Sequence, residues 1–171
     1  MKTLLLLRHA KSSWDDPSLA DFDRPLAPRG QNAARRVGRE LTTRGWLPDR
    51  ALVSPAVRTR QTWELVSAAL PTKPPADFRE ALYDAPAEKI LAEIRRAPRA
   101  ANTILVLGHN PGLEDLARQI AGEESDADIL ERLRKKFPTA ALTRFALDGG
   151  WQELKAVSAR LTHFVTPKEL D

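Results

Sequence analysis

The apolar run Leu4–Leu7, which stops abruptly at Arg8 and His9, constrains the fold of this chain more than any other stretch. Consecutive leucines followed by charge are typical of a strand that is buried on both faces, so we predict a strand over Thr3–Leu7. Strands of this kind belong to α/β proteins, in which ligands bind outside the carboxyl ends of the strands. The first strand is therefore expected to carry an imidazole and a guanidinium to the edge of the sheet where ligands bind.

Two further apolar runs predict buried strands, over Ala51–Ser54 and Thr103–Leu107. Between the strands, apolar residues recur at helical spacing, and Gly45 is placed to cap the first helix. The pattern predicts helices from a lead-in at 26–30 to about 44, and over about 55–70, 87–96, 113–121 and 126–135. This alternation predicts a single domain over residues 1–171 with a three-layer α/β/α fold and a mostly parallel central sheet.

Three segments depart from the alternation. Residues 11–29 lack periodicity and are rich in Asp and Pro, which predicts a long loop of the kind that is often functional. The proline-rich segment 71–75 is expected to be an extended connection. Thr139–Leu147 and Trp151–Phe164 flank a Gly-Gly turn and predict two strands that form an antiparallel edge pair. His163, within the second of these, is expected to be structural.

Composition narrows the classes of site. The 171 residues include no cysteine, which excludes disulfides, thiolate metal sites and a cysteine nucleophile. The N-terminal apolar run is too short for a signal peptide and no stretch approaches a transmembrane length, so we expect a cytoplasmic protein without a membrane partner. The net charge is +4, but basic residues are spread beside acidic ones and aromatic residues are few. We therefore expect no nucleic-acid partner, and the oligomeric state stays open.

All three predicted strands end at residues that can carry chemistry. The first ends at Arg8 and His9, the second leads into a helix whose first turn carries Arg58, and the third ends at Gly108 and His109. Neighbouring parallel strands bring such ends to one rim of the sheet. Two arginines and two histidines held together repel one another and are costly to desolvate unless a dianion binds among them. The set therefore predicts a phosphate-binding site.

The chemistry of phosphoryl transfer assigns a role to each member of this set. A neutral imidazole is a competent nucleophile near neutral pH, so His9 is predicted to accept a phosphoryl group that water later removes. Arg8 and Arg58 are predicted to bind the phosphoryl oxygens, and His109, if protonated, adds a third positive donor. A metal is the competing use of two histidines. No third ligand stands at a suitable spacing and the arginines repel a cation, so we expect no metal and no cofactor.

At this point the residues resemble the histidine phosphatase superfamily, the phosphoglycerate mutase-like proteins. Arg8-His9-Ala10 is similar to the family's Arg-His-Gly segment, residues 54–62 to its Ser-Pro…Arg…Thr segment, and residues 108–112 to its second-histidine segment. Arg24-Pro25-Leu26 followed by Gly30 resembles its Leu-Thr-x-x-Gly segment. Within the superfamily, the short length, the opening Arg-His-Ala-Lys-Ser-Ser-Trp and the ending at 164–170 resemble the SixA branch, the phosphohistidine phosphatases.

The resemblance implies a metal-independent phosphatase with a covalent phosphohistidine intermediate on His9, and a phosphate pocket made of Arg8, Arg58 and His109. It also implies a phosphohistidine-bearing phosphotransfer protein as the substrate. Ala10 departs from the family pattern, and its methyl group is tolerated if φ there is negative.

The proton donor that many relatives use is less clear in the sequence. Glu80 is the nearest match, and its alternative role is a surface carboxylate paired with Arg79 or Lys89. A phosphohistidine substrate makes an acid less necessary, because imidazole leaves more readily than an alkoxide.

Three other functions stay open from the sequence. A phosphatase for a small phosphomonoester or phosphorylated metabolite would depend strongly on Glu80. A non-catalytic module would bind a phosphoprotein without turning it over, and intact pocket residues argue against it. Nucleic-acid binding would be salt-dependent and independent of His9. Mutase activity is less expected, because it requires the product to reorient in a closed site.

Overall fold

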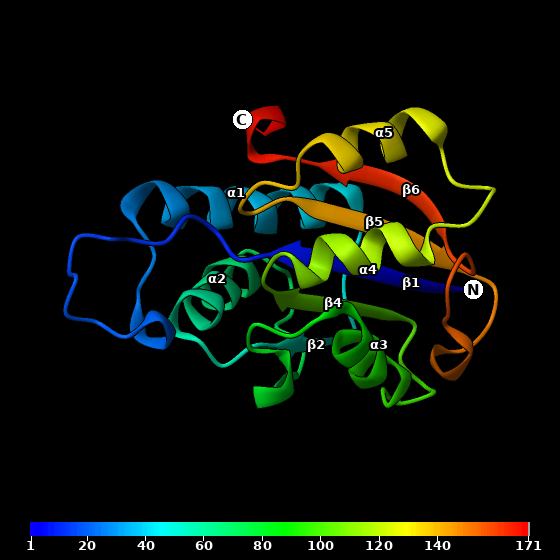
Figure 1. The fold of residues 1–171 in the computed structure, drawn as a ribbon, viewed down its shortest axis with the longest axis horizontal. Helices are drawn as coiled ribbons and strands as arrows, with labels where there is room; N and C mark the ends of the chain where they lie inside the picture. The colour runs from blue at the N-terminus through cyan, green and yellow to red at the C-terminus, as the bar shows by residue number, and fades with distance from the viewer. Residues whose placement is uncertain (171) are drawn as a thin grey trace.

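The computed structural model describes residues 1–170, which form a six-stranded sheet between helices (Figure 1). The strands run in the spatial order β3-β2-β4-β1-β5-β6. The first four are mutually parallel, and β5 is antiparallel to both β1 and β6. The predicted α/β fold with a mostly parallel sheet and an antiparallel edge is confirmed. The strands are β1 (Lys2–Arg8), β2 (Arg50–Val53), β3 (Ala76–Phe78), β4 (Thr103–Gly108), β5 (Leu142–Leu147) and β6 (Arg160–Val165).

Every helix predicted from periodicity is present, with ends that differ by one to a few residues. Gly45 caps the first helix as expected, with φ of 71° and its N–H donating to the carbonyls of Leu41 and Thr42. Asp126 caps the last α-helix by accepting the N–H groups of Asp128 and Ile129. The helices are α1 (Pro28–Arg44), α2 (Val57–Ala68), α3 (Ala87–Arg95), α4 (Gly112–Ile120) and α5 (Ala127–Lys135), with short 3₁₀ helices η1 (Asp21–Asp23), η2 (Glu80–Leu82), η3 (Trp151–Glu153) and η4 (Pro167–Glu169).

The leucine run of β1 is fully buried because helices cover both faces of the sheet around it. Leu4 and Leu6 belong to a core that includes residues of α3, α4 and α5, whereas Leu5 and Leu7 belong to a second core with α1 and α2. All four side chains have 0% exposure. Two cores anchor β1 between β4 and β5, and the strand therefore delivers its carboxyl end to a fixed position in the middle of the sheet.

The predicted strand over Trp151–Phe164 is wrong in its first half. Trp151–Glu153 form η3, and the strand begins only at Arg160. The buried Trp151 indole donates Nε1–H to the carbonyl of Ala101 at 2.9 Å, and the Glu153 carboxylate accepts the Gly150 N–H at 3.2 Å. Burial of one large side chain and a local cap therefore override the β-propensity of the segment.

The structure also adds one strand and corrects one strand boundary. A fourth parallel strand, β3, follows the proline-rich connection and pairs with β2, with Ala76 opposite Ala51. Three residues are too few to display an alternating pattern, so the sequence did not reveal it. β5 begins at Leu142 instead of Thr139. His163 lies half-buried on β6, with its ring centroid 4.7 Å from that of Trp46. Among residues 1–170, no helix has the length and apolar character needed to cross a bilayer.

Candidate functional site

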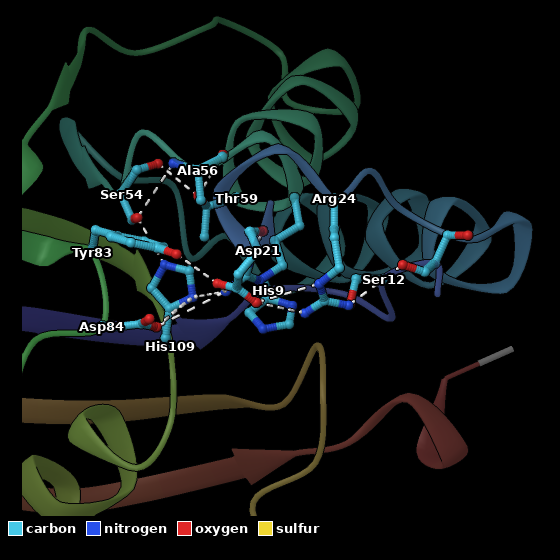
Figure 2. Close-up of polar contacts among 12 residues, drawn as sticks. His9, Ser12, Asp21, Arg24, Ser54, Ala56, Thr59, Tyr83, Asp84 and His109 are labelled. Carbon is cyan, nitrogen blue, oxygen red and sulfur yellow. Dashed lines mark hydrogen bonds and ion pairs between the residues drawn. The ribbon is translucent and has the colours of Figure 1, made fainter. Parts of the chain in front are cut away.

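The ends of three strands meet as predicted, and they bring the two histidines together (Figure 2). Arg8 is opposite Gly108 in the parallel ladder, and the His9 N–H donates to the Gly108 carbonyl at 3.1 Å. The rings of His9 and His109 lie 5.4 Å apart between centroids. On the other side of β4, the Ser54 N–H donates to the carbonyl of Leu107 at 3.0 Å. Backbone pairing alone therefore places the ends of β1, β2 and β4 at one edge.

His9 is held in one orientation and one tautomer. Its Nδ1 lies 2.7 Å from the carbonyl oxygen of Ala10, which can only accept a hydrogen bond, so Nδ1 carries the proton and Nε2 keeps its lone pair. Burial, reinforced by the nearby charges of Arg58, Arg8 and Arg24, lowers the His9 pKa to about 4. Near neutral pH this imidazole is uncharged, with an unprotonated Nε2 of the kind that a nucleophile requires.

The turn after His9 accommodates alanine without strain. Within residues 1–170, the non-glycine residues with positive φ are Asp84, Ala140 and Val157, so the backbone at Ala10 does not require glycine. Ala10 is fully buried in the core, and its N–H donates to Thr62 Oγ1 at 3.1 Å. A glycine is required at Gly30 instead, because a Cβ there would lie 2.1 Å from the Lys11 carbonyl oxygen.

Arg58, in the first turn of α2, makes three hydrogen bonds through its guanidinium and is only 4% exposed. Its Nη2 donates to Asp21 Oδ2 at 3.1 Å and to His109 Nδ1 at 3.2 Å, while Nη1 donates to the Asp21 carbonyl at 2.8 Å. The Arg58 carbonyl accepts the hydroxyl of Thr62, the residue that also binds Ala10. The backbone of Arg58 is thus linked through Thr62 to the turn that carries His9.

Four buried arginine Nε atoms have no acceptor within residues 1–170, and two of them, those of Arg8 and Arg58, belong to the site. Arg8 is otherwise held by the carbonyl of Phe137, which accepts from Nη1 at 2.9 Å. Burial lowers the Arg8 pKa, and Glu114 opposes the shift. Because buried donors are normally paired, two unpaired arginine nitrogens in one site indicate a place for an anionic acceptor.

His109 is neutral in this structure. Its Nδ1 accepts from Arg58, which can only donate, so the proton is on Nε2 and is donated to Ser54 Oγ at 2.8 Å. Burial is the main cause that lowers its pKa to about 3, followed by the charges of His9 and Arg58. The protonated form that would make His109 a third positive donor is therefore not populated near neutral pH.

The structure adds residues that the sequence did not assign to the site, and three of them, Asp21, Tyr83 and Arg24, form one cluster. The carboxylate of Asp21, in η1, accepts from the Tyr83 hydroxyl at 2.6 Å and from Arg24 Nη2 at 3.1 Å, in addition to Arg58. The Tyr83 hydrogen bond is the largest cause that lowers the Asp21 pKa to about 2. Arg24 is 7% exposed and also donates to Ser12 Oγ. The feature of the sequence that could have pointed to Asp21 is the high density of Asp in the long loop.

The structure does not connect Glu80 with the other site residues. Its side chain is exposed, and within residues 1–170 it makes no hydrogen bond or ion pair, while Arg79 pairs with Glu93 and Asp77. Asp84, just beyond η2, instead reaches the site, with Oδ1 3.8 Å from His109 Nδ1 and 3.9 Å from Arg58 Nη2. Asp84 has φ of 47°, and backbone strain of this kind gathers at functional sites.

The same part of the chain, residues 1–170, holds no group of three His, Cys, Asp or Glu side chains arranged to bind a metal ion. The charged groups that surround the two histidines are arginines and two carboxylates, arranged as donors and acceptors for hydrogen bonds. The site can therefore hold a phosphoryl group through guanidinium donors.

Comparison with known sequences identifies a family. The profile of the histidine phosphatase superfamily (branch 1) matches residues 4–132. An uncharacterised protein of Mycobacterium tuberculosis is 37% identical over 95% of this chain and 100% of its own length. An uncharacterised chloroplastic protein of Arabidopsis thaliana is 34% identical over 92% of this chain and 72% of its own length.

Solved structures show the same fold. A protein of Nakamurella multipartitia assigned as the phosphohistidine phosphatase SixA superposes with a TM-score of 0.83 at 32% identity, covering 97% of this chain and 96% of its own. A protein of Agrobacterium tumefaciens with the same assignment gives a TM-score of 0.82 at 30% identity, covering 97% and 98%. A protein histidine phosphatase SixA complexed with tungstate gives a TM-score of 0.78 at 21% identity, covering 97% of each chain.

Proposed function

The chain belongs to the histidine phosphatase superfamily, and we propose that it is a phosphatase that removes the phosphoryl group from phosphohistidine in a protein, through a phosphorylated His9. The observation that carries the proposal is the state of His9: Nδ1–H is bonded to the Ala10 carbonyl, Nε2 is unprotonated, and the ring is beside the guanidinium donors. A fixed neutral imidazole next to unpaired arginine nitrogens suits attack on a phosphoryl group.

In the first step, His9 Nε2 attacks phosphorus, the new N–P bond forms, and the P–N bond to the substrate imidazole breaks. The substrate imidazole leaves as a neutral ring when its other nitrogen already carries a proton, so no proton has to be delivered to the leaving atom. Arg8 and Arg58 bind the phosphoryl oxygens, and the Nε atoms without partners supply donors for them. The Nδ1–H group of His9 stays hydrogen-bonded to the Ala10 carbonyl throughout the step.

In the second step, water attacks phosphorus and the bond to His9 breaks, releasing inorganic phosphate. The retained Nδ1–H makes this step the chemical mirror of the first, because His9 again leaves as a neutral imidazole in its original tautomer. One proton is lost from the attacking water to solvent or to phosphate. His109, with a lowered pKa, donates Nε2–H to Ser54 and accepts from Arg58, which keeps both groups aligned during the cycle.

The protein substrate is supported by three features. Two solved structures with 32% and 30% identity are assigned as phosphohistidine phosphatases, and this chain covers 96% and 98% of them. Imidazole is a better leaving group than an alkoxide, and the carboxylate expected from the sequence, Glu80, is exposed and unpaired. A small-molecule phosphatase is the second candidate. The position of Asp84 beside His109 favours it, because an ester needs an acid at its leaving oxygen.

The test is phosphate release, with chelator present, from a phosphohistidine-bearing protein and from an alkyl phosphate. It compares the wild type with Asp84→Asn and Glu80→Gln. We expect the wild type to act on phosphohistidine and both variants to stay within about threefold of it, because no acid is needed there. On the alkyl phosphate, loss of a working acid costs about 10²-fold or more.

Each contrary result has a definite meaning. Turnover of the alkyl phosphate alone, with a large loss of rate in Asp84→Asn, would support the small-molecule phosphatase instead. Loss of activity on chelation would contradict the metal-independent mechanism. A stable complex with the phosphoprotein and no phosphate release would point to a binding module.

A further inference from the structure

We propose that the Asp21 carboxylate is an internal competitor of phosphate: it occupies Arg58, gives way to the substrate phosphoryl group, and returns to expel product phosphate. This inference rests on the proposed function for the identity of the anion, and it assigns to Asp21 a role in exchanging that anion. It is carried by the contacts that Asp21 makes and by its place between solvent and the buried arginine.

Asp21 uses the donors that a phosphoryl group would need. One Arg58 nitrogen, Nη1, donates to the Asp21 carbonyl at 2.8 Å, and the other, Nη2, donates to Asp21 Oδ2 at 3.1 Å. The second hydrogen of Nη2 is directed to His109 Nδ1 at 3.2 Å, so both hydrogens of Nη2 are committed. An incoming phosphoryl oxygen can gain a charge-assisted bond to Nη2 only by replacing one of these acceptors.

Asp21 also lies on the solvent side of the arginine. The Arg58 side chain is 4% exposed, whereas the Asp21 side chain is 46% exposed. In the view of Figure 2, the Asp21 carboxylate lies between the rings of His9 and His109. An anion that approaches Arg58 from solvent therefore meets the Asp21 carboxylate first. Since the Asp21 pKa is lowered to about 2, this carboxylate stays ionised throughout the neutral range.

The segment that carries Asp21 can yield without disturbing the sheet. The base of the loop is closed by backbone bonds from Ser13 to Pro25 and from Ala27 to Lys11. Above that base, the backbone bonds of residues 16–24 are internal to the loop, such as Asp23 N–H to the Ala20 carbonyl. Asp21 joins this part of the loop to Arg58 through its carboxylate and its backbone carbonyl, its carboxylate also accepts from Tyr83, and the Phe22 ring packs against the Tyr83 ring. Release of the carboxylate from Arg58 therefore breaks a side-chain contact and no backbone bond of β1 or α1.

The displaced carboxylate keeps other partners. Tyr83 and Arg24 both donate to Asp21, so a small shift off Arg58 does not leave the charge without hydrogen bonds. The exchange then substitutes a dianion for a monoanion at Arg58, which strengthens the interaction with the guanidinium, while the proximity of the returning carboxylate weakens the hold on product. An internal competitor of this kind lowers phosphate affinity and speeds phosphate release.

The experiment is equilibrium titration of tungstate and inorganic phosphate by calorimetry into the wild type, Asp21→Asn, Tyr83→Phe and Asp23→Asn, with product-inhibition kinetics alongside. Asparagine keeps the size of Asp21 but not its charge, and we expect both anions to bind about tenfold more tightly, with a lower KM and no gain in kcat. Tyr83 donates to Asp21 whether the carboxylate is on Arg58 or has shifted off it, so Tyr83→Phe should alter anion affinity by less than about twofold. Asp23 is an exposed aspartate in the same 3₁₀ helix, so Asp23→Asn makes the same charge change away from Arg58 and should alter affinity by less than about twofold.

Weaker anion binding in Asp21→Asn would overturn the proposal, because it would show that Asp21 positions Arg58 for phosphate. An equal gain in anion affinity in Asp21→Asn and Asp23→Asn would also overturn it, because the effect would then come from the overall negative charge of the loop. The titration needs no turnover, so it separates this inference from the proposed function. If the protein fails to hydrolyse phosphohistidine but Asp21→Asn still shows the tenfold shift in anion affinity, the role of Asp21 stands and only the proposed substrate is wrong.

Discussion

His9, Ser54, Arg58 and His109 form an inner set that is buried, whereas Asp21, Tyr83 and Asp84 form an outer set that is open to solvent. The inner set is fixed by the backbone: His9 and Ser54 follow strands whose N–H groups pair across the sheet, and His109 follows β4. The outer set comes from a loop and from the residues after η2, and it is held by side-chain contacts. Exposure of the side chains rises from 4% at Arg58 to 46% at Asp21 and 55% at Asp84.

This difference indicates a division of labour. A nucleophile and its phosphate donors need fixed geometry, which buried strand ends provide. Substrate entry and product exit need groups that move, and such groups come from regions with few backbone bonds to the core. The predictions below concern the inner set and run from the largest expected effect to the smallest. Matched positions outside the set serve as controls for the substitutions.

The largest effect is expected for His9→Ala. Without a nitrogen to accept the phosphoryl group, phosphate release should fall by at least about 10³-fold, and no phospho-enzyme should be trapped by an alkaline denaturing quench, which preserves a P–N bond. His163→Ala is the matched control, because His163 lies on β6 beside Trp46 and outside the inner set. A trapped phospho-enzyme in His9→Ala would place the nucleophile elsewhere.

A second, smaller loss is expected for Arg58→Lys. The ammonium keeps the charge but cannot bond Asp21 and His109 from one planar group, so kcat/KM should fall by about 10²-fold. Arg60→Lys, on an exposed position of the same helix, should keep the wild-type value. If the two variants behave alike in steady-state kinetics, charge alone would explain the role of Arg58.

The inner set also predicts a pH dependence of stability. The pKa values of His9 and His109 are lowered to about 4 and about 3, mainly by burial. Below the unfolded value near 6.5 the unfolded chain therefore binds more protons than the folded chain. The free energy of unfolding should fall as the pH drops from about 6.5 towards 4, by up to about 1.4 kcal/mol per pH unit for each histidine.

Urea unfolding of the wild type and of His9→Ala between pH 5 and pH 7 measures this slope. The variant has one histidine fewer to protonate on unfolding, so its stability should depend less steeply on pH. Parallel curves for the two proteins would contradict the assignment of a neutral, buried His9.

The smallest effect is expected for Ser54→Ala. It removes the acceptor of the His109 Nε2–H, a buried hydrogen bond of 2.8 Å whose loss costs about 1 kcal/mol. This corresponds to a fall of about five- to tenfold in kcat/KM. Ser67→Ala also removes a buried hydroxyl, but its partner is the Glu64 carbonyl within α2. Activity lost equally in both variants would indicate a general loss of packing.

Much of the fold and of the inner set could be predicted because both depend on local pattern. The Leu4–Leu7 run is buried on both faces, so the presence of a buried strand there follows from hydrophobicity. In the helices, apolar residues recur at the spacing that places them on one face of a helix. η3 escaped prediction because a buried Trp151 decided the backbone there, and β3 because three residues carry no period.

By itself, the sequence determined which side chains stand at strand ends, and therefore that His9, Arg58 and His109 share one edge of the sheet. Only the tertiary structure decided their protonation states and which groups lie around them. The tautomers follow from a carbonyl at Ala10 and a guanidinium at Arg58, and the lowered pKa values follow from burial. Asp21 meets Arg58 and Tyr83 across 37 and 62 residues of chain. Such contacts leave no local pattern, because they depend on where the loop lies in space and not on which residues adjoin it.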